Sequence, residues 1–167
     1  MSSQLICVDR NNKPAGYADW KACHGLKPKL HLGFTVLIFN KNNELLLQKR
    51  SKLKPLWPDF WDGTSSHPNK GDSFICAGER RLKEEMGFTC RLKKTNQFIY
   101  KAKYKNLGWE WEVCAILEGK YDGKVKPDPK EVGNYKWASI NNLKKEIKLK
   151  PEIYAPWLRI IIGKDVL

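Results

Sequence analysis

The chain has 167 residues, 41% of them hydrophobic, which is enough for one domain with a single core and leaves no second domain to explain. Its 31 Lys and Arg against 18 Asp and Glu give a formal net charge of +13, which favours phosphate-bearing partners: nucleic acid, an anionic membrane or a diphosphate metabolite. Much of the excess lies in scattered lysine pairs typical of a solvated surface, so we do not expect nucleic acid as the partner.

The N-terminal half predicts strands followed by a long loop. Residues 5–9 and 32–39 are expected to be strands, and the second is apolar almost throughout, which is typical of a strand buried in a sheet. A turn at 40–43 would lead into a strand over 44–48 that pairs back on the one before it. Residues 51–70, rich in proline and aromatic side chains, predict an ordered loop of the kind that commonly carries function.

The C-terminal half predicts one main helix and several further elements. Between Asp72 and Met86 apolar side chains recur at helical spacing, and Gly87 follows as a C-terminal stop. The other elements are expected in chain order as strands over 96–104, 109–118 and 133–137 and helices over 139–147 and 151–162.

All three histidines of the chain can join a Glu-x-Glu pair in one site. In the strand over 109–118 polar and apolar side chains alternate, and this period of two puts both glutamates on one face. Three imidazoles and two carboxylates suit a divalent cation in octahedral geometry and leave a position open for a substrate oxygen. The predicted ligands are His24, His31, His67, Glu110 and Glu112.

Cysteine usage and the N-terminus bear on the compartment. The five cysteines form no Cys-x-x-Cys pair, and their odd number indicates a reducing compartment rather than a disulfide framework. The first ten residues lack the basic start and apolar run of a secretory signal, and no segment approaches the ~18 apolar residues of a membrane span. We therefore expect a cytoplasmic protein with no membrane span.

The segment RRLKEEMGF at residues 80–88 is similar to the C-terminal half of a Nudix box, in which glutamates hold Mg²⁺ against a diphosphate. The usual box has Arg-Glu where this chain has Arg80-Arg81, and it begins with Gly where this chain has Ser66. Type I isopentenyl diphosphate isomerases depart from the box in the same way, and the chain resembles them over roughly residues 20–160. The resemblance implies an α/β fold, a Nudix-type α/β/α sandwich with a mixed sheet, in a single domain over residues 1–167.

The resemblance also implies two metal ions. The three histidines and the Glu-x-Glu pair occupy the family's ligand positions for a divalent ion, which could be Mg²⁺, Mn²⁺ or Zn²⁺. Glu85 matches a carboxylate that helps to hold a second ion, a Mg²⁺ bound to the diphosphate.

Further positions match the residues that bind substrate in this family. Arg50, Lys54 and Arg81 stand where the family keeps its diphosphate-binding cations, and Lys21 lies one position away from a corresponding lysine. Trp157 matches the indole that shields a carbocation. The partner that the resemblance implies is thus a small-molecule diphosphate, bound by a monomer.

Moving a double bond in a homoallylic diphosphate needs a proton delivered to one carbon and another removed from the opposite side, and hence two acid–base groups. The resemblance implies that Glu112, with Tyr100 beside it, is one of them, and the other is a cysteine in the family. The loop at residues 61–68 is one residue shorter than the family's and has Ser65 at that position, although a hydroxyl ionises far less readily than a thiol. Asp62 could supply a carboxylate if the loop turns it inward, or it is only part of an Asp-Gly turn.

Three functions remain open on the sequence. The first is an isomerase that interconverts isopentenyl and dimethylallyl diphosphate, with Ser65, Asp62 or an ordered water as the second proton-transfer group. The second is a Mg²⁺-dependent hydrolase of a prenyl or nucleoside diphosphate, whose water would be activated by Glu84 or Glu85. The third is a catalytically silent protein that binds isoprenoid diphosphates or RNA. We favour the isomerase, because a hydrolase has no evident need for the histidine-rich site or the tryptophan.

Overall fold

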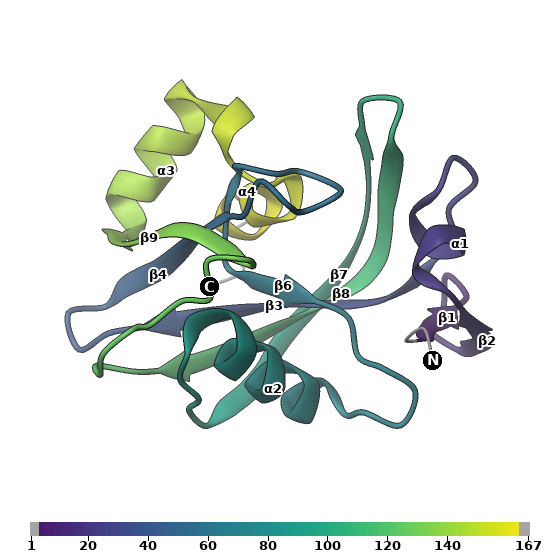
Figure 1. Cartoon of the computed structure of the whole chain (residues 1–167), viewed down its shortest axis with the longest axis horizontal. Coiled ribbons are helices and arrows are strands. Elements are labelled where there is room, and N and C mark those ends of the chain that lie inside the picture. Colours follow the sequence, from purple (N-terminus) through teal and green to yellow (C-terminus); the bar gives the residue numbers. More distant parts are fainter. Residues whose placement is uncertain (1–3, 164–167) are drawn as a thin grey trace.

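The computed structural model describes residues 4–163, where nine strands form one mixed sheet with helices on both faces (Figure 1). The strands are β1 (Leu5–Val8), β2 (Pro14–Ala18), β3 (His31–Phe39), β4 (Glu44–Arg50), β5 (Trp61–Asp62), β6 (Thr64–Ser66), β7 (Leu92–Tyr104), β8 (Gly108–Lys120) and β9 (Val132–Ser139). The helices are α1 (Trp20–His24), α2 (Phe74–Met86), α3 (Ile140–Leu149) and α4 (Pro156–Gly163), with a 3₁₀ turn η1 (Pro151–Ile153). No helix in residues 4–163 is long and apolar enough to cross a membrane.

Strand β3 organises the sheet. It pairs with β8 in parallel, from His31 opposite Glu112 to Phe39 opposite Lys120, and antiparallel with β1, β4 and β6. Strands β7 and β8 form a long antiparallel hairpin, the far end of which rises beyond the rest of the sheet in Figure 1. The N-terminal segment with β1, β2 and α1 lies beside this hairpin, so residues distant in sequence meet at this end of the sheet.

Two hydrophobic layers sandwich the sheet. Val36 and Ile38 of β3 pack on one side with helix α2, in which Leu82 is fully buried. Leu37, between them in sequence, packs on the other side with residues of α3 and α4, such as Leu158. Alternating side chains of one strand thus supply both layers, and burying each aliphatic side chain contributes about 1.5–3 kcal/mol.

The main helix is confirmed with its predicted stop. Ser73 precedes helix α2, and its hydroxyl accepts a hydrogen bond from the Cys76 amide at 3.1 Å. Gly87 ends the helix in the left-handed region at φ 77°, where a Cβ would lie only 2.2 Å from the Lys126 carbonyl oxygen. Only glycine meets both demands, so the sequence marks this end of the helix clearly.

The predicted strands are found, but two predictions about their surroundings are wrong in part. Strand β4 pairs with β3 only at Phe39 opposite Leu45 and then diverges to pair along its length with β9, so the predicted hairpin exists only beside its turn. The loop predicted over 51–70 contains the short strands β5 and β6. Strand β6 docks on β3, which fixes this segment against the sheet.

Three elements differ from the sequence reasoning near the ends of the chain. The single helix predicted over 151–162 is split into η1 and α4, because Pro156 disfavours a helical conformation at the residue before it. Strand β2, exposed over most of its length, and helix α1, five residues long, were not predicted. Both are too short or too polar for periodicity, although Asp19, which caps α1 by accepting from the Ala22 amide at 2.8 Å, is a recognisable start signal.

Candidate active site

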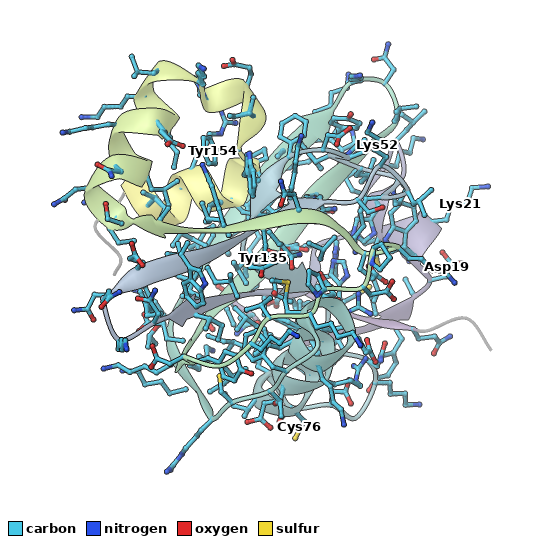
Figure 2. All side chains as sticks on the ribbon, turned by 60° about the vertical axis from the view of Figure 1, so that its left-hand side comes forward. Asp19, Lys21, Lys52, Cys76, Tyr135 and Tyr154 are labelled. Carbon is cyan, nitrogen blue, oxygen red and sulfur yellow. The ribbon has the colours of Figure 1, made fainter. Side chains whose placement is uncertain are left out.

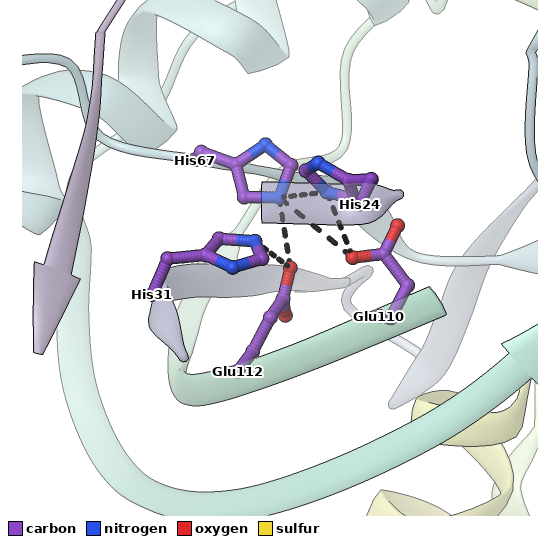
Figure 3. Close-up of side chains that lie close together, drawn as sticks. All are labelled: His24, His31, His67, Glu110 and Glu112. Carbon is purple, nitrogen blue, oxygen red and sulfur yellow. Dashed lines mark hydrogen bonds and ion pairs between the residues drawn. The ribbon is translucent and has the colours of Figure 1, made fainter. Parts of the chain in front are cut away.

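Five side chains from four segments of the chain converge at one end of the sheet (Figure 3). Their ligand atoms all lie within 4.8 Å of one another. His24 ends α1, His31 begins β3, His67 directly follows β6, and the two glutamates lie on β8. The parallel register sets His31 opposite Glu112, and the period of two turns Glu110 to the same face. The structure thus brings together all five residues that the sequence grouped as metal ligands.

Backbone carbonyls orient two of the imidazole rings. His24 Nδ1 lies 2.9 Å from the Trp20 carbonyl oxygen, and His31 Nδ1 lies 2.8 Å from that of Lys29. A carbonyl only accepts, so Nδ1 carries the proton in each ring, and the neutral ring presents its Nε2 lone pair to the centre of the cluster. Histidine ligands of metal ions are commonly held by such a hydrogen bond on the other ring nitrogen.

The donor atoms fit a divalent cation. Among the described residues, His31 Nε2 and Glu110 Oε2 are buried without a hydrogen-bond partner. Burial and the neighbouring histidines lower the pKa of His31 and of His67 to about 3, so both rings are neutral at neutral pH. Unpartnered atoms, neutral imidazoles and two carboxylates make a donor set that a divalent ion would satisfy.

Glu112 belongs to both the cluster and the adjoining cleft. Its Oε1 lies 2.8 Å from His67 Nε2, while its Oε2 accepts a hydrogen bond from the Tyr100 hydroxyl at 2.9 Å. Burial raises the pKa of Glu112, against the opposing effects of His24 and Tyr100. The pKa of His24 shifts in the other direction. Burial lowers it, but the nearby negative charge of Glu110, whose Oε2 lies 3.0 Å from His24 Nε2, outweighs burial and raises it.

Gly33 leaves the space that the Glu112 carboxylate occupies. A Cβ at Gly33 would lie 2.2 Å from Glu112 Oε2 and 2.3 Å from its Cδ. No side chain can be accommodated there unless Glu112 moves. The sequence analysis missed this position, although a glycine inside an apolar strand commonly marks a close approach of another group.

A cleft of about 440 Å³ opens beside the cluster. Its wall includes Glu110, Glu112, Tyr100, Ser65 and Trp157 together with basic side chains of other elements. Such a volume suits a small ligand, and the combination of cations, carboxylates and an indole suits one with an anionic and an apolar part.

The basic part of the cleft is tied together by carboxylates. Lys54 Nζ forms an ion pair with Glu131, and Arg81 Nη2 lies 3.3 Å from the same carboxylate oxygen. Arg81 also donates to Glu84 at 2.6 Å and to Glu85 at 2.7 Å. Burial raises the pKa of Glu131, but hydrogen bonds and charge from Lys54 and Arg81 outweigh burial and lower it. Glu131 was missed by sequence reasoning, because nothing in its loop marks it.

Glu85 lies with these cations and not with the five clustered ligands. Its side chain is fully buried, its Oε2 accepts from the Gln48 amide at 2.7 Å, and its Oε1 accepts from Arg81. A metal ion held by Glu85 would therefore have to compete with these hydrogen bonds or share the remaining lone pairs.

The other two predicted cations differ in placement. Arg50 is 8% exposed and uses most of its guanidinium to bind the loop before β5, donating to the carbonyls of Trp57 and Leu56 at 2.9 Å each. It also lines the cleft. Lys21 is exposed on α1 at the periphery of the molecule (Figure 2) and is not part of the cleft wall as described. Trp20, its neighbour, lines the cleft and stacks on His24 with ring centroids 4.5 Å apart.

The sequence matches known proteins along almost its whole length. Residues 29–159 match the NUDIX domain family. The "Isopentenyl-diphosphate Delta-isomerase" of Haloarcula marismortui is 35% identical, and the match covers 97% of this chain and 90% of the relative. The "Isopentenyl-diphosphate Delta-isomerase 2" of Photorhabdus laumondii is 36% identical over 98% of this chain and 92% of the relative.

Solved structures share the fold. DR0079 from Deinococcus radiodurans superposes with a TM-score of 0.78 at 16% identity, covering 96% of this chain and 98% of that one. The MutT protein from Methanosarcina mazei superposes with a TM-score of 0.67 at 20% identity, covering 81% and 91%. The predicted Nudix-type sandwich is thereby confirmed. From its sequence relatives, the chain belongs to the type I isopentenyl-diphosphate isomerase family within the Nudix superfamily.

Proposed function

We propose that this protein interconverts isopentenyl and dimethylallyl diphosphate. The observation that carries the proposal is the placement of Glu112, a buried carboxyl with a raised pKa that joins a His-rich ligand cluster to a cleft with a basic wall. A hydrolase of diphosphates has no evident need for such a carboxyl in a cleft that is also lined by the indole of Trp157. The relatives named as isomerases support the same activity.

The reaction adds a proton to the terminal CH₂ carbon and removes one from the methylene that adjoins the branched carbon on its diphosphate side. Glu112 is proposed to deliver the first proton, because burial raises its pKa and so shifts the carboxyl toward the protonated form. Tyr100 holds Glu112 Oε2 by a hydrogen bond. Ser65, which lines the cleft from β6, is proposed to act on the second proton.

The charges of the cleft support a bound diphosphate. Lys54 and Arg81 would pair with phosphate oxygens, Arg81 through its planar fork of donors. Arg50 adds positive charge at the cleft wall, and Lys21 would have to swing inward to contribute. Trp157 presents its ring in the same wall, where a π face would stabilise the positive charge that develops on the tertiary carbon. We propose a monomer as the active unit.

We propose that the His-Glu cluster holds one divalent ion, Mg²⁺, Mn²⁺ or Zn²⁺, and that Glu85 assists a Mg²⁺ bound with the diphosphate. When bound, the first ion supplies positive charge that orients Glu112 and a substrate oxygen. The three imidazoles suit zinc or manganese better than magnesium as the ion of the cluster.

The hydrolase alternative would need a free carboxylate to activate water. Both oxygens of Glu85 are engaged by Gln48 and Arg81, and position 81 carries an arginine. Glu84 is half exposed but pairs with Arg81 at 2.6 Å. These contacts argue against water activation by either glutamate and favour the isomerase.

The deciding experiment is incubation of the metal-loaded protein with isopentenyl diphosphate in D₂O, followed by NMR. Appearance of deuterated dimethylallyl diphosphate, lost in a Glu112→Gln variant, is the expected result. Release of phosphate or diphosphate would instead establish the hydrolase. Tight binding of the substrate without turnover, with turnover restored by Ser65→Cys, would establish a silent binding protein built on an isomerase scaffold.

A further inference from the structure

Asp62 is a buried carboxylate directly behind Ser65. Its exposed fraction is 0%, and its Oδ1 accepts hydrogen bonds from Ser65 Oγ at 3.1 Å, Trp157 Nε1 at 2.8 Å and the Gly63 amide at 2.8 Å. Ser65 lines the cleft, whereas Asp62 does not. Ser65 therefore stands between this carboxylate and any ligand in the cleft.

The contacts of the Ser65 hydroxyl favour donation to Asp62. Trp157 Nε1, 3.0 Å away, can only donate, so it cannot receive the serine proton. The Thr35 hydroxyl, 2.9 Å away, can donate or accept, but it is a neutral acceptor. The Asp62 carboxylate is the stronger acceptor of the two. The serine hydrogen is thus directed at Asp62 and not at the cleft. Trp157 donates to one lone pair of Ser65 Oγ, and the second is free for a ligand when the Thr35 hydroxyl donates to Cys114 Sγ, 3.7 Å away.

The environment of Asp62 suits reversible protonation. Burial raises the pKa of Asp62 to about 6, against the charge of Arg50 and hydrogen bonds from Ser65 and Trp157. Arg50 Nη1 of β4 lies 3.4 Å from Oδ2, Gln48 pairs with Asp62 across β4 and β5, and the Cys114 thiol of β8 faces it from the sheet. Of these neighbours Arg50 is charged and Cys114 is titratable, whereas Gln48 is uncharged. A carboxylate in this range can accept a proton and return it near neutral pH.

We infer that Asp62 receives the substrate proton through Ser65, so that a serine and a buried aspartate together replace a single thiol. This inference rests on the proposed isomerase function. Ser65 Oγ takes a proton from the substrate methylene while its own proton passes to Asp62 Oδ1. The C–H bond breaks, its electron pair becomes the new C=C bond, one O–H bond forms on Ser65 and one on Asp62, and the former Ser65 O–H bond breaks.

The cycle closes without any other reagent. After product leaves, Asp62 returns its proton to solvent through Ser65, while Glu112 regains from solvent the proton that it delivered. Asp62 does not touch substrate in this scheme, so it is a positioning residue that acts through Ser65. An aspartate with a merely structural role would support the loop and Arg50 equally well whatever side chain stood at position 65.

That difference defines the experiment, which measures isomerisation by Asp62→Asn in the parent and in a Ser65→Cys background. A thiol can carry the proton alone, so the aspartate should matter only when serine is present. We expect Asp62→Asn to lower kcat by about 100-fold or more in the parent, with a smaller change in KM. In the Ser65→Cys background we expect Asp62→Asn to lower kcat by less than about tenfold. The parent kcat/KM should rise with pH through about 6, and Asp62→Asn should lose this inflection. Asp59→Asn, which alters an exposed aspartate paired with Lys49, is the matched control and should keep the parent activity.

Each contrary result has a distinct meaning. Equal losses in both backgrounds would overturn the inference and leave Asp62 a structural role. If Asp62→Asn fails to fold, as judged by circular dichroism and thermal melting, the Ser65→Ala variant tests the inference instead. The relay requires Ser65→Ala to lose kcat to a similar extent and to lose the pH inflection. Retained activity in Ser65→Ala would overturn the inference. No isomerisation by the well-folded parent would instead refute the proposed function itself.

Discussion

Tyr100 stands directly opposite Glu112 on the neighbouring strand, and its hydroxyl donates a hydrogen bond to Glu112 Oε2 at 2.9 Å. Burial and the charge of Glu112 raise the pKa of Tyr100 well above its ordinary value, so the phenol is protonated at neutral pH. It is therefore a permanent donor, and it holds one oxygen of Glu112 while the other faces the histidines.

Replacing Tyr100 with Phe should slow the reaction without unfolding the hairpin. A hydrogen bond to a charged group contributes about 1.5–3 kcal/mol, so we expect kcat to fall by about 10- to 100-fold. Steady-state kinetics with isopentenyl diphosphate measure this loss, and circular dichroism checks the fold. A kcat within about twofold of the parent would show that Glu112 does not depend on this donor.

Replacing His67 with Ala should abolish stoichiometric metal binding. The parent is expected to retain about one tightly held divalent ion per chain after metal-replete purification, because five donors converge in the cluster. Elemental analysis of parent and variant measures this. Glu118→Gln, on the same strand but outside the cluster, is the control. Full metal content in His67→Ala, or none in the parent, would contradict the assignment.

A methyl group at Gly33 should displace Glu112. Because the added Cβ would lie 2.2 Å from a carboxylate oxygen, we expect Gly33→Ala to lose metal and most activity and to be destabilised by about 1–3 kcal/mol. Gly133→Ala on β9 is the matched control, since its Cβ would meet only the Lys49 carbonyl oxygen at 3.9 Å. Denaturant unfolding and elemental analysis of both variants decide. Parent-like metal content in Gly33→Ala would show that the site adapts.

Neutralising Glu131 should strengthen binding of diphosphate. Its carboxylate engages Lys54 and Arg81 in the way that a phosphate oxygen would, so substrate has to compete with it. We expect Glu131→Gln to lower the Kd for inorganic diphosphate by a few-fold, with a stability change of about 1 kcal/mol or less because the pair is partly exposed. Glu146→Gln removes an equal charge at Lys136, outside the cleft, and should leave the Kd unchanged in calorimetry. Weaker binding by Glu131→Gln would mean that Glu131 positions the two cations.

The sequence predicted those features that depend on local pattern. The period of two in β8 correctly placed Glu110 and Glu112 on one face, and Gly87 correctly marked the end of α2. The grouping of the histidines with the glutamates followed from residue type, since it uses all three histidines of the chain.

Features that depend on which strands meet could not be predicted in this way. Gly33 matters only because β3 lies parallel to β8, and that pairing joins segments about 80 residues apart in sequence. The sequence alone allows Asp62 to be either a turn residue or an inward-pointing carboxylate. The pairing of β5 with β4 distinguishes the two. Glu131 reaches Lys54 and Arg81 from a loop before β9 that carries no motif.

The β7–β8 hairpin separates the positions where this chain can change length from those where it cannot. Its paired rungs run from Leu92 opposite Gly119 to Tyr104 opposite Gly108, and the turn beyond them lies outside the cleft wall. Extra residues in that turn would leave the pairing register of the two strands unchanged. One residue inserted between Tyr100 and Tyr104 would shift the pairing register by one, turn Tyr100 to the opposite face of the sheet and break its hydrogen bond to Glu112. Insertions and deletions in natural variants should therefore occur at the turn and be absent from the paired parts of the strands.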